Sequence, residues 1–305
     1  MINVADLFSG MGGFSLAARM AGCRVIWAAN HWREAVDTHQ ANHPEAEHAC
    51  QDLHQQDWSA VPDMDLLLAS SACQGHTPAR GKERPHHDAA RSTAWAVISA
   101  IEAKKPLAAL GENVPAFLSW ALYPAWVAAL NALGYSVAPH LSDAADHGVP
   151  QNRERVMLAI TKSKHPIALN VPICPHRPAS SFIDFDAGRW SPINKPGRSA
   201  NTLARIASGR RAHGERFLAP YYGSGSGTTG RSLDRPIGTI TTRDRWAVID
   251  GDRMRMLTKD ENRAGMGFPV DYVLPRSHKL AVHMLGNAVA PWQGRDYILA
   301  LKAAL

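Results

Sequence analysis

Short apolar runs alternate with segments of helical periodicity along the first 160 residues. Such short runs are typical of strands that are buried on both faces of a sheet. This order of elements predicts an α/β fold with a doubly wound, mostly parallel sheet. Strands are expected at residues 2–8, 24–29, a short one ending near 51–53, 66–69, 106–111, 135–138 and 156–160. Helices are expected at about residues 15–22, 32–42, 91–103 and 123–133.

The periodic pattern fades after residue 164, and Pro, Gly, Ser and Arg dominate residues 166–232. This composition predicts a small, loop-rich module, while its glycine-rich stretch 223–227 could equally be a flexible linker. Residues 80–90 are polar, rich in His and without periodicity, so we expect a mobile loop of the kind that closes over active sites. An extended segment and three helices complete the chain, at residues 235–242, 259–266, 279–289 and 292–304.

Positive charge is concentrated in one part of the chain. The formal net charge is +6, but residues 161–234 contain 11 Lys and Arg against 4 Asp and Glu, and the remainder contains 22 against 23. Such a stretch is either a solvated basic face or a surface that contacts phosphate groups.

The composition indicates a protein of the cytoplasm. No apolar run approaches the ~18 residues that a membrane span needs, and the first residues lack the basic and apolar regions of a signal peptide. The four cysteines are scattered without a CxxC pair. They predict neither a disulfide framework nor a zinc site, and they fit a reducing cytosol.

A glycine-rich turn follows the first strand, in the sequence Asp6-Leu7-Phe8-Ser9-Gly10-Met11-Gly12-Gly13-Phe14. A strand, a glycine turn and a helix in succession make a nucleotide-binding loop plausible. The third glycine of the dinucleotide fingerprint would fall at position 15, which is Ser15. A dinucleotide oxidoreductase is therefore disfavoured, and an ordinary tight connection remains open.

Cys73 and Glu112 each lie just beyond an apolar strand, in the same register. Open α/β sheets bind their ligands at the carboxyl ends of strands, although a cysteine there is often only a small buried residue. Glutamate is rarely buried without a partner or a task. Asp52, at the end of another strand, is either an acceptor for the exocyclic amine of a bound base or a helix cap.

Several short motifs occur in a fixed order. They are the glycine turn, Cys73-Gln74, Glu112-Asn113-Val114, Gln151-x-Arg153-x-Arg155, a variable basic stretch, Arg235-Pro236-x-x-Thr239 and Gly286-Asn287-Ala288-Val289. This order closely resembles that of the DNA (cytosine-5) methyltransferases. The resemblance implies a Rossmann-like class I methyltransferase fold with a small, irregular target-recognition domain. It divides the chain into a catalytic and cofactor-binding domain at 1–160, target recognition at 161–234, and a return to the catalytic domain at 235–305.

The resemblance also implies a mechanism for the transfer of a methyl group to carbon 5 of a flipped-out cytosine in duplex DNA. Carbon 5 is a poor nucleophile until a thiolate adds to carbon 6, and a cysteine thiolate is well suited to that attack. Cys73 is the matching nucleophile. Glu112 matches the carboxyl group that contacts ring nitrogen 3 and the exocyclic amine, and Arg153 and Arg155 match the arginine pair that supports this geometry. Asn113 is expected to be a structural residue of the loop.

The donor that the resemblance implies is S-adenosylmethionine, which leaves as S-adenosylhomocysteine, with no metal. The expected partner is duplex DNA, bound by a monomer at the nucleoid, in restriction–modification, phage or regulatory methylation. The cofactor-binding residues would be Phe8, Ser9, Gly10, Met11, Gly12, Gly13, Asn30, His31, Asp52, Leu53, Ser71 and Asn287. The DNA-binding residues would be Gln74, Lys82, Arg84, Arg91 and Gln151.

The sequence departs from the family pattern at two places. Ala72 occupies the position of a proline, and Gly75-His76-Thr77 replaces the common Phe-Ser pattern. At the end of the second strand, either Asn30 or His31 occupies the position of the carboxylate that accepts both ribose hydroxyls. An amide can still bond a hydroxyl, so we expect weakened or reoriented ribose binding. Transfer of a modified group from an analogue of S-adenosylmethionine is the alternative.

Two further alternatives remain from the sequence alone. One is the same chemistry on RNA, although residues 161–234 lack the Cys-Phe-Thr signature of the branch that acts on tRNA. The other is an inactive homologue that binds DNA, against which the intact Cys73, Glu112, Arg153 and Arg155 argue.

Overall fold

A computed structural model of the 305-residue chain describes all residues except 73–84 and 222–228, and gives no side-chain description for 85–91. The chain divides into two compact units. The first consists of Met1–Asp143, Glu154–Ile173 and Ala288–Leu305. The second consists of Ala144–Arg153 and Cys174–Asn287.

The described part of the first unit contains a seven-stranded sheet with the order β3-β2-β1-β4-β5-β7-β6. Every neighbouring pair is parallel except those of β7, which runs antiparallel to both β5 and β6. This confirms the predicted doubly wound, mostly parallel sheet. The strands are β1 (Asn3–Leu7), β2 (Arg24–Asn30), β3 (Glu47–Cys50), β4 (Leu66–Ala69), β5 (Ala108–Asn113), β6 (Ser136–Asp143) and β7 (Glu154–Thr161).

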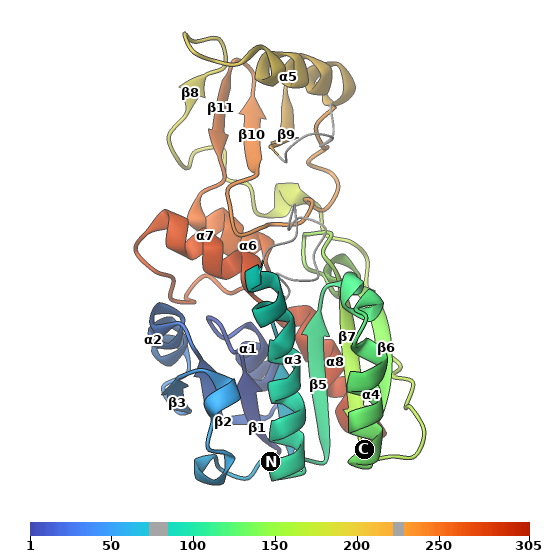
Figure 1. Ribbon diagram of the computed structural model, residues 1–305. Coiled ribbons are helices and arrows are strands. Elements are labelled where there is room, and N and C mark those ends of the chain that lie inside the picture. Colours follow the sequence, from blue (N-terminus) through green and yellow to red (C-terminus); the bar gives the residue numbers. More distant parts are fainter. Residues whose placement is uncertain (73–84, 222–228) are drawn as a thin grey trace. The chain divides into compact units, whose positions relative to one another are not determined.

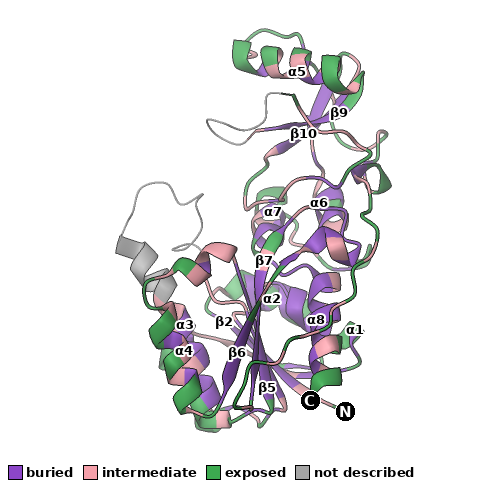
Figure 2. Cartoon of the chain, turned by 90° about the vertical axis from the view of Figure 1, so that its right-hand side faces the viewer, coloured by how far each residue is buried: buried purple, intermediate pink, exposed green. Residues whose placement is uncertain are grey.

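Helices cover both faces of this sheet, and Figure 2 shows the strands buried between them. Alternate residues of each strand point to opposite faces, so one core contains Leu7 and Leu67 and the other contains Val4 and Leu68. Helices α3 and α4 pack on the first face, and α1 and α8 pack on the second (Figure 1). The helices of this unit are α1 (Gly13–Met20), α2 (Arg33–Asn42), α3 (Pro85–Lys104), α4 (Tyr123–Ala132) and α8 (Pro291–Ala304).

The described residues of the second unit form a small antiparallel sheet with the order β8-β11-β10-β9. Helix α5 packs on it through Ile206, and Phe217 and Ile249 belong to the same core. The elements are β8 (Ser191–Pro192), α5 (Ala200–His213), β9 (Arg216–Pro220), β10 (Trp246–Asp250), β11 (Arg253–Met256), α6 (Lys259–Gly265) and α7 (His278–Asn287). Short 3₁₀ turns occur in the chain at η1 (Leu53–Gln55), η2 (Trp58–Ala60), η4 (Pro115–Ser119), η5 (Ala144–His147) and η6 (Ala179–Ser181).

The expectation that residues 166–232 are irregular is wrong for α5. Ser199 caps this helix by accepting a hydrogen bond from the Thr202 N–H, as N-cap serines commonly do. Only Thr202, Ile206 and Gly209 are buried in this helix, and alanine occupies four of its six exposed positions. Gly209 is buried against the Phe217 ring, so closely that a Cβ on Gly209 would lie 2.2 Å from it. The apolar stripe is therefore too narrow to appear as a periodic pattern.

The expected loop at residues 80–90 is wrong for its second half, because α3 begins at Pro85. Proline suits a first helical position, where its missing N–H would have no partner in any case. Residues 80–84 lie outside the described part of the chain.

The compact units divide the chain at different residues from the predicted domains. Residues 161–173 belong to the first unit, where Leu169 and Val171 pack against its core. The second unit extends from residue 174 to 287 and also takes in 144–153. The role of residues 161–234 in target recognition stays a prediction. Among the described helices, none is long and apolar enough to cross a membrane.

Candidate functional site

The glycine turn at residues 8–13 joins β1 to α1 and has an unusual backbone. The angle φ is positive at Phe8 (57°), Gly10 (53°) and Gly12 (100°). Glycine adopts this region without the steric cost that a side chain incurs, whereas Phe8 adopts it with a side chain. Gly10 and Gly12 therefore occupy two of the three positions at which the turn has a positive φ.

Two contacts fix this turn within the first unit. The Ser9 N–H donates to the Ala29 carbonyl at 3.0 Å, which ties the turn to the end of β2. Gly13 lies against the chain before α8, and a Cβ there would be 2.3 Å from the Val289 carbonyl oxygen. The turn is thus held in place by the fold itself.

A chain of buried polar groups lies behind the turn. The Ser15 hydroxyl donates to Asp6 Oδ2 at 2.7 Å, and His39 Nε2 lies 2.9 Å from the same hydroxyl. His39 Nδ1 lies 2.8 Å from His48 Nε2. Burial raises the pKa of Asp6 to about 7, against the opposing effect of the Ser15 hydrogen bonds. Burial, together with nearby Arg19, lowers the pKa of His43 to about 4.

The end of β2 carries the residues that replace the family's carboxylate. Asn30 is buried, and its Oδ1 accepts a hydrogen bond from the Trp32 N–H at 3.0 Å. Its amide nitrogen is a donor, so Asn30 can bond a hydroxyl oxygen but offers no charge. His31 is exposed.

Asp52 and Leu53 follow β3 with different roles. Asp52 is exposed, and its Oδ1 accepts a hydrogen bond from the His54 N–H at 3.0 Å, so it caps η1. Leu53 is buried in the core. The exposed Asp52 carboxylate and the Asn30 amide match the amine and the hydroxyl of an amino-acid nucleoside. The first unit therefore offers groups that fit such a cofactor.

The segment that leads from β4 to Cys73 is anchored at successive residues. The Ser70 N–H donates to the Leu7 carbonyl at 3.3 Å. Asn113 Nδ2 donates to the carbonyl and hydroxyl oxygens of Ser71 at 3.1 and 3.2 Å. These bonds confirm the structural role expected for Asn113.

Ala72 has an anchor of its own, because its N–H donates to Thr93 Oγ1 on α3 at 3.1 Å. A proline at this position would have no N–H to donate. The departure from the family pattern is therefore accompanied by a hydrogen bond that the pattern excludes.

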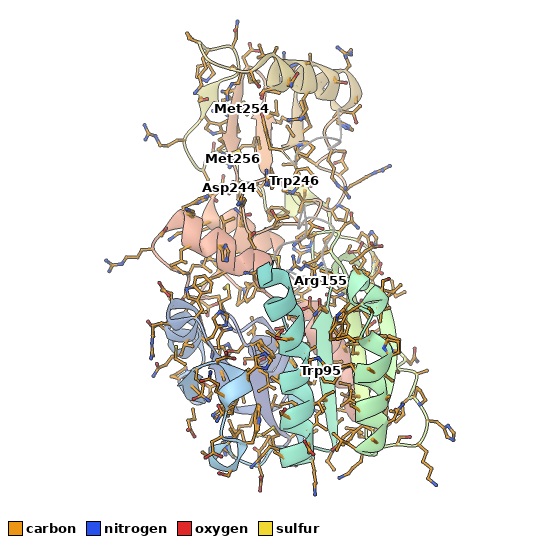
Figure 3. All side chains as sticks on the ribbon, in the orientation of Figure 1. Trp95, Arg155, Asp244, Trp246, Met254 and Met256 are labelled. Carbon is orange, nitrogen blue, oxygen red and sulfur yellow. The ribbon has the colours of Figure 1, made fainter. Side chains whose placement is uncertain are left out.

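Glu112 and Arg155 form an ion pair at the carboxyl end of β5, with Oε1 and Nε 2.8 Å apart. Their side chains are 9% and 12% exposed, so water screens the pair only weakly. Glu112 lies within β5, one residue beyond Gly111, which pairs with the last residue of β4. Figure 3 labels Arg155 near this end of the strand. The carboxylate thus lies at the same edge of the sheet as the segment that leads to Cys73.

Arg153 and Gln151 belong to the second unit and are buried there. Arg153 donates from Nη1 to the Ile240 carbonyl at 3.1 Å and from Nη2 to the Gly286 carbonyl at 2.9 Å. Gln151 donates to the Gly265 carbonyl and accepts from the Ile240 N–H at 2.7 Å. These bonds give both residues a structural task, and Gln151 has no exposed surface for a DNA contact.

Several predicted residues lie where the structure gives no description. Cys73, Gln74, Lys82 and Arg84 lie outside the described residues, and Arg91 lies on α3 without a described side chain. Asn287 is exposed at the end of α7 in the second unit. Their roles stay predictions.

Sequence reasoning missed Thr93 and the buried histidines. Thr93 contacts Ala72 across 21 residues, and His39 contacts Ser15 across 24. No local pattern marks such long-range partners. The only signal for the histidines is their density between residues 39 and 48.

Comparison with known proteins agrees with this geometry. A family model, C-5 cytosine-specific DNA methylase, matches residues 2–186. The type II methyltransferase M.NlaX of Neisseria lactamica is 28% identical over 315 residues, covering 100% of this chain and 97% of that protein. M.BsuFI of Bacillus subtilis is 26% identical, covering 95% of this chain and 69% of that protein.

Solved structures share the fold. The DNMT2 of Spodoptera frugiperda superposes with a TM-score of 0.71 at 17% identity, covering 99% of this chain and 100% of that one. The family model spans more than half of the chain and includes the glycine turn and the Glu112–Arg155 pair. This protein therefore belongs to the C-5 cytosine-specific DNA methylases.

Proposed function

We propose that this enzyme methylates carbon 5 of a flipped-out cytosine in duplex DNA through a covalent adduct with Cys73. The observation that carries the proposal is the buried Glu112–Arg155 pair at 2.8 Å. It lies at the carboxyl end of β5, next to the anchored segment that leads from β4 toward Cys73. A carboxylate that is nearly buried at a ligand-binding edge is well suited to contact a polar ring.

The first step is the addition of the Cys73 thiolate to carbon 6 of cytosine. An S–C6 bond forms. The electron pair of the C5=C6 bond is then shared between carbon 5 and nitrogen 3, which makes carbon 5 a nucleophile. Glu112 contacts nitrogen 3 and the exocyclic amine, where the new electron density gathers. Proton donation at that position stabilises the adduct.

Arg155 positions Glu112 for this contact. Its guanidinium stays charged and offers donors in a fixed geometry, and its Nη1 also donates to the Glu154 carbonyl at 2.6 Å. Arg155 therefore limits the rotamers that the glutamate can adopt.

S-adenosylmethionine supplies an electrophilic methyl group when bound, and residues 8–13, Asn30 and Asp52 would hold it. Carbon 5 takes the methyl group, the proton donated at nitrogen 3 returns to Glu112, and a base then removes the carbon 5 proton. The electron pair of that C–H bond restores the C5=C6 double bond and expels the Cys73 thiolate. The enzyme is thereby regenerated.

The target carbon lies inside the base stack of duplex DNA, so the base has to be extruded at a cost of about a few kcal/mol. The basic stretch 161–234 supports DNA as the partner, because such charge suits phosphate contacts and a separate module suits the reading of base edges.

The test is an incubation with methyl-labelled S-adenosylmethionine and either unmethylated genomic DNA or total RNA, followed by mass analysis of the nucleosides. We expect labelled 5-methylcytosine in DNA, its loss in Cys73→Ser and its retention in the matched control Cys50→Ser. Donor binding without labelled product in DNA would refute the proposal. Labelled product in RNA alone would identify RNA, and not DNA, as the substrate. A heavier substituent on carbon 5, formed with donors from a cell extract, would identify a modified donor.

A further inference from the structure

The second unit contains a pocket of about 460 Å³ between α7 and the segment before β10. Three groups that carry or can carry positive charge line it, together with a hydroxyl, an apolar side chain and one carboxylate. The lining residues are Thr242, Arg243, Asp244, Lys279, Val282 and His283.

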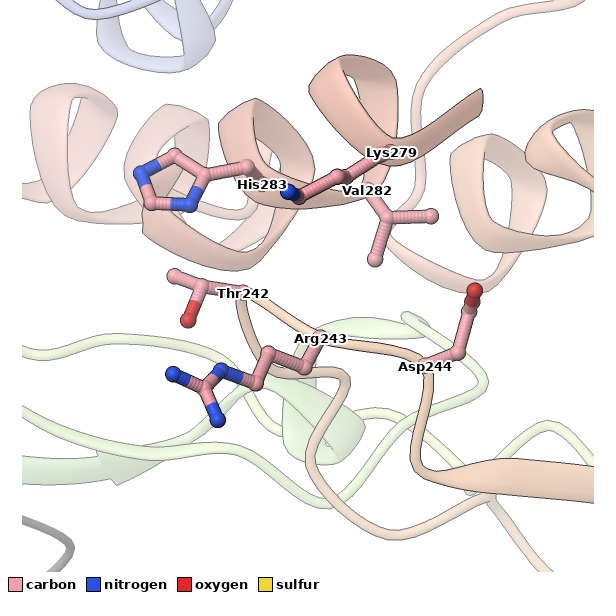
Figure 4. A pocket seen from close by; sticks show the side chains of 6 residues that line it. All are labelled: Thr242, Arg243, Asp244, Lys279, Val282 and His283. Carbon is pink, nitrogen blue, oxygen red and sulfur yellow. The ribbon is translucent and has the colours of Figure 1, made fainter. Parts of the chain in front are cut away.

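The positive groups gather at one end of the pocket. Figure 4 shows the Arg243 guanidinium and the Thr242 hydroxyl opposite the Lys279 ammonium and the His283 ring, with the Asp244 carboxylate at the other end. Lys279 and His283 are one helical turn apart on α7, so they share a face. Four donor side chains from two segments therefore face one space.

The carboxylate does not neutralise this end. Asp244 Oδ2 lies 2.9 Å from His278 Nε2, so Asp244 already has a partner. Within the described part of the chain, neither Arg243 nor Lys279 forms an ion pair with a carboxylate. Burial lowers the pKa of His283, and the charges of Arg243 and Lys279 lower it further. Arg243 and Lys279 thus repel each other and oppose a charge on His283, and an anion placed between them would relieve that repulsion.

The two walls of the pocket are fixed to each other. Gly286 packs so closely on the other wall that a Cβ would lie 2.3 Å from the backbone at Thr241 and Thr242. Arg153 donates to the Ile240 carbonyl on one wall and to the Gly286 carbonyl on the other. The cationic side chains therefore extend from a preorganised frame, which lowers the cost of binding.

We propose that this pocket binds a phosphate group of the DNA backbone. An arginine fork, a lysine ammonium and a hydroxyl are the donors that backbone phosphates take from proteins. The inference rests on the proposed function, since DNA is the partner. The excess positive charge of the chain lies within residues 161–234, and this pocket assigns a DNA contact outside that stretch.

The test measures the salt dependence of duplex DNA binding for the wild type, Arg243→Gln, Lys279→Gln and the double variant. A phosphate contact contributes about 0.9 to the slope of log affinity against log salt. Between 50 and 200 mM salt, the double variant should therefore lose about three- to fourfold less affinity than the wild type. Because both side chains bind one phosphate, the double variant should change the slope by one contact and not two. The loss should be the same for DNA of different sequences, because phosphate contacts carry no sequence information.

The matched control is Lys105→Gln, an exposed lysine of the first unit at the amino end of β5. Melting temperatures confirm that the variants are folded. Wild-type affinity and slope in the double variant, or an equal effect of the control, would overturn the inference. Inorganic phosphate at constant ionic strength should weaken DNA binding more for the wild type than for the double variant. If inorganic phosphate binds the pocket while all three pocket variants keep full DNA affinity, the pocket takes free phosphate and the inference fails. Failure of wild-type enzyme to bind or methylate DNA would instead reject the proposed function.

Discussion

Ala72 shows how a single residue can change the way the segment before Cys73 is held. Its N–H donates to Thr93 Oγ1 at 3.1 Å, one residue before Cys73. A proline would fix φ but could not donate. The enzyme thus uses a hydrogen bond from Ala72 to Thr93 on α3 where the family pattern has a proline ring.

Replacing Thr93 by valine should lower kcat about fivefold, because a hydrogen bond of about 1 kcal/mol is lost from the segment that positions Cys73. The KM for DNA should change little. Steady-state methylation rates measure both quantities. Thr93→Ser keeps the hydroxyl and should restore the wild-type kcat. A valine variant with wild-type kcat would mean that Thr93 does not position the loop.

Asp6 provides a residue whose protonation affects stability. Its pKa is raised from 3.8 to about 7 by burial, so the folded protein keeps a proton that the unfolded chain has released. The favourable contribution is therefore complete below pH 3.8 and is lost as the pH rises to about 7. The lowered pKa of His43 acts in the opposite direction, since its contribution is lost as the pH falls from 6.5 through about 4.

Asp6→Asn removes only the first of these effects. Between pH 5 and pH 8, the free energy of unfolding of the wild type should fall by about 2 to 3 kcal/mol relative to that of the variant. Urea unfolding at several pH values measures this difference, in which the His43 contribution cancels. The exposed Asp37→Asn is the control and should show no such trend. A difference that is independent of pH would contradict the account of Asp6.

At the scale of elements, the glycine turn shows why a motif needs its surroundings. Gly10 and Gly12 are needed for positive φ, but Gly13 is needed because Val289 lies against it. The sequence alone cannot distinguish these reasons, since Val289 is far along the chain.

Gly13→Ala should destabilise the protein by about 2 to 3 kcal/mol, because the new methyl group would meet backbone and not a side chain that can move. It should also weaken binding of S-adenosylhomocysteine, measured by calorimetry, since the turn has to shift. Gly22→Ala is the comparison. A Cβ there meets open space at a φ of 72°, so it should cost only about 1 kcal/mol. Equal donor affinity in Gly13→Ala and wild type would contradict this account.

Elements with continuous apolar runs were predictable from the sequence, and β4 has the predicted bounds. Helix α5 was not predictable, because too few of its positions are buried to give a periodic apolar pattern. The predicted ends of β4 and β5 were enough to place Glu112 at the edge of the sheet formed by the carboxyl ends of the parallel strands. The resemblance named Arg155 as a support of the cysteine–glutamate geometry, and the structure pairs Arg155 with Glu112. The bonds of Arg153 to Ile240 and Gly286 depend on long-range pairing, which no local pattern reveals.

At the scale of the whole molecule, the chain assigns neighbouring motif residues to different units. Arg155 belongs to the first unit and contacts Glu112, whereas Arg153, two residues earlier, belongs to the frame of the second. The chain crosses from one unit to the other between residues 153 and 154. The Gln-x-Arg-x-Arg motif thus contributes both to the ion pair of the first unit and to the construction of the second unit.

The central claim is the covalent attack by Cys73, and a trapping experiment tests it most directly. DNA in which every cytosine is replaced by 5-fluorocytosine is incubated with the enzyme and S-adenosylmethionine, because fluorine at carbon 5 cannot leave as a proton and so blocks elimination. We predict an adduct that survives denaturation, carries the transferred methyl group and maps to Cys73 by peptide mass analysis, and that is absent in Cys73→Ser. An enzyme that methylates ordinary DNA but gives no adduct, or an adduct at another residue, would contradict the claim.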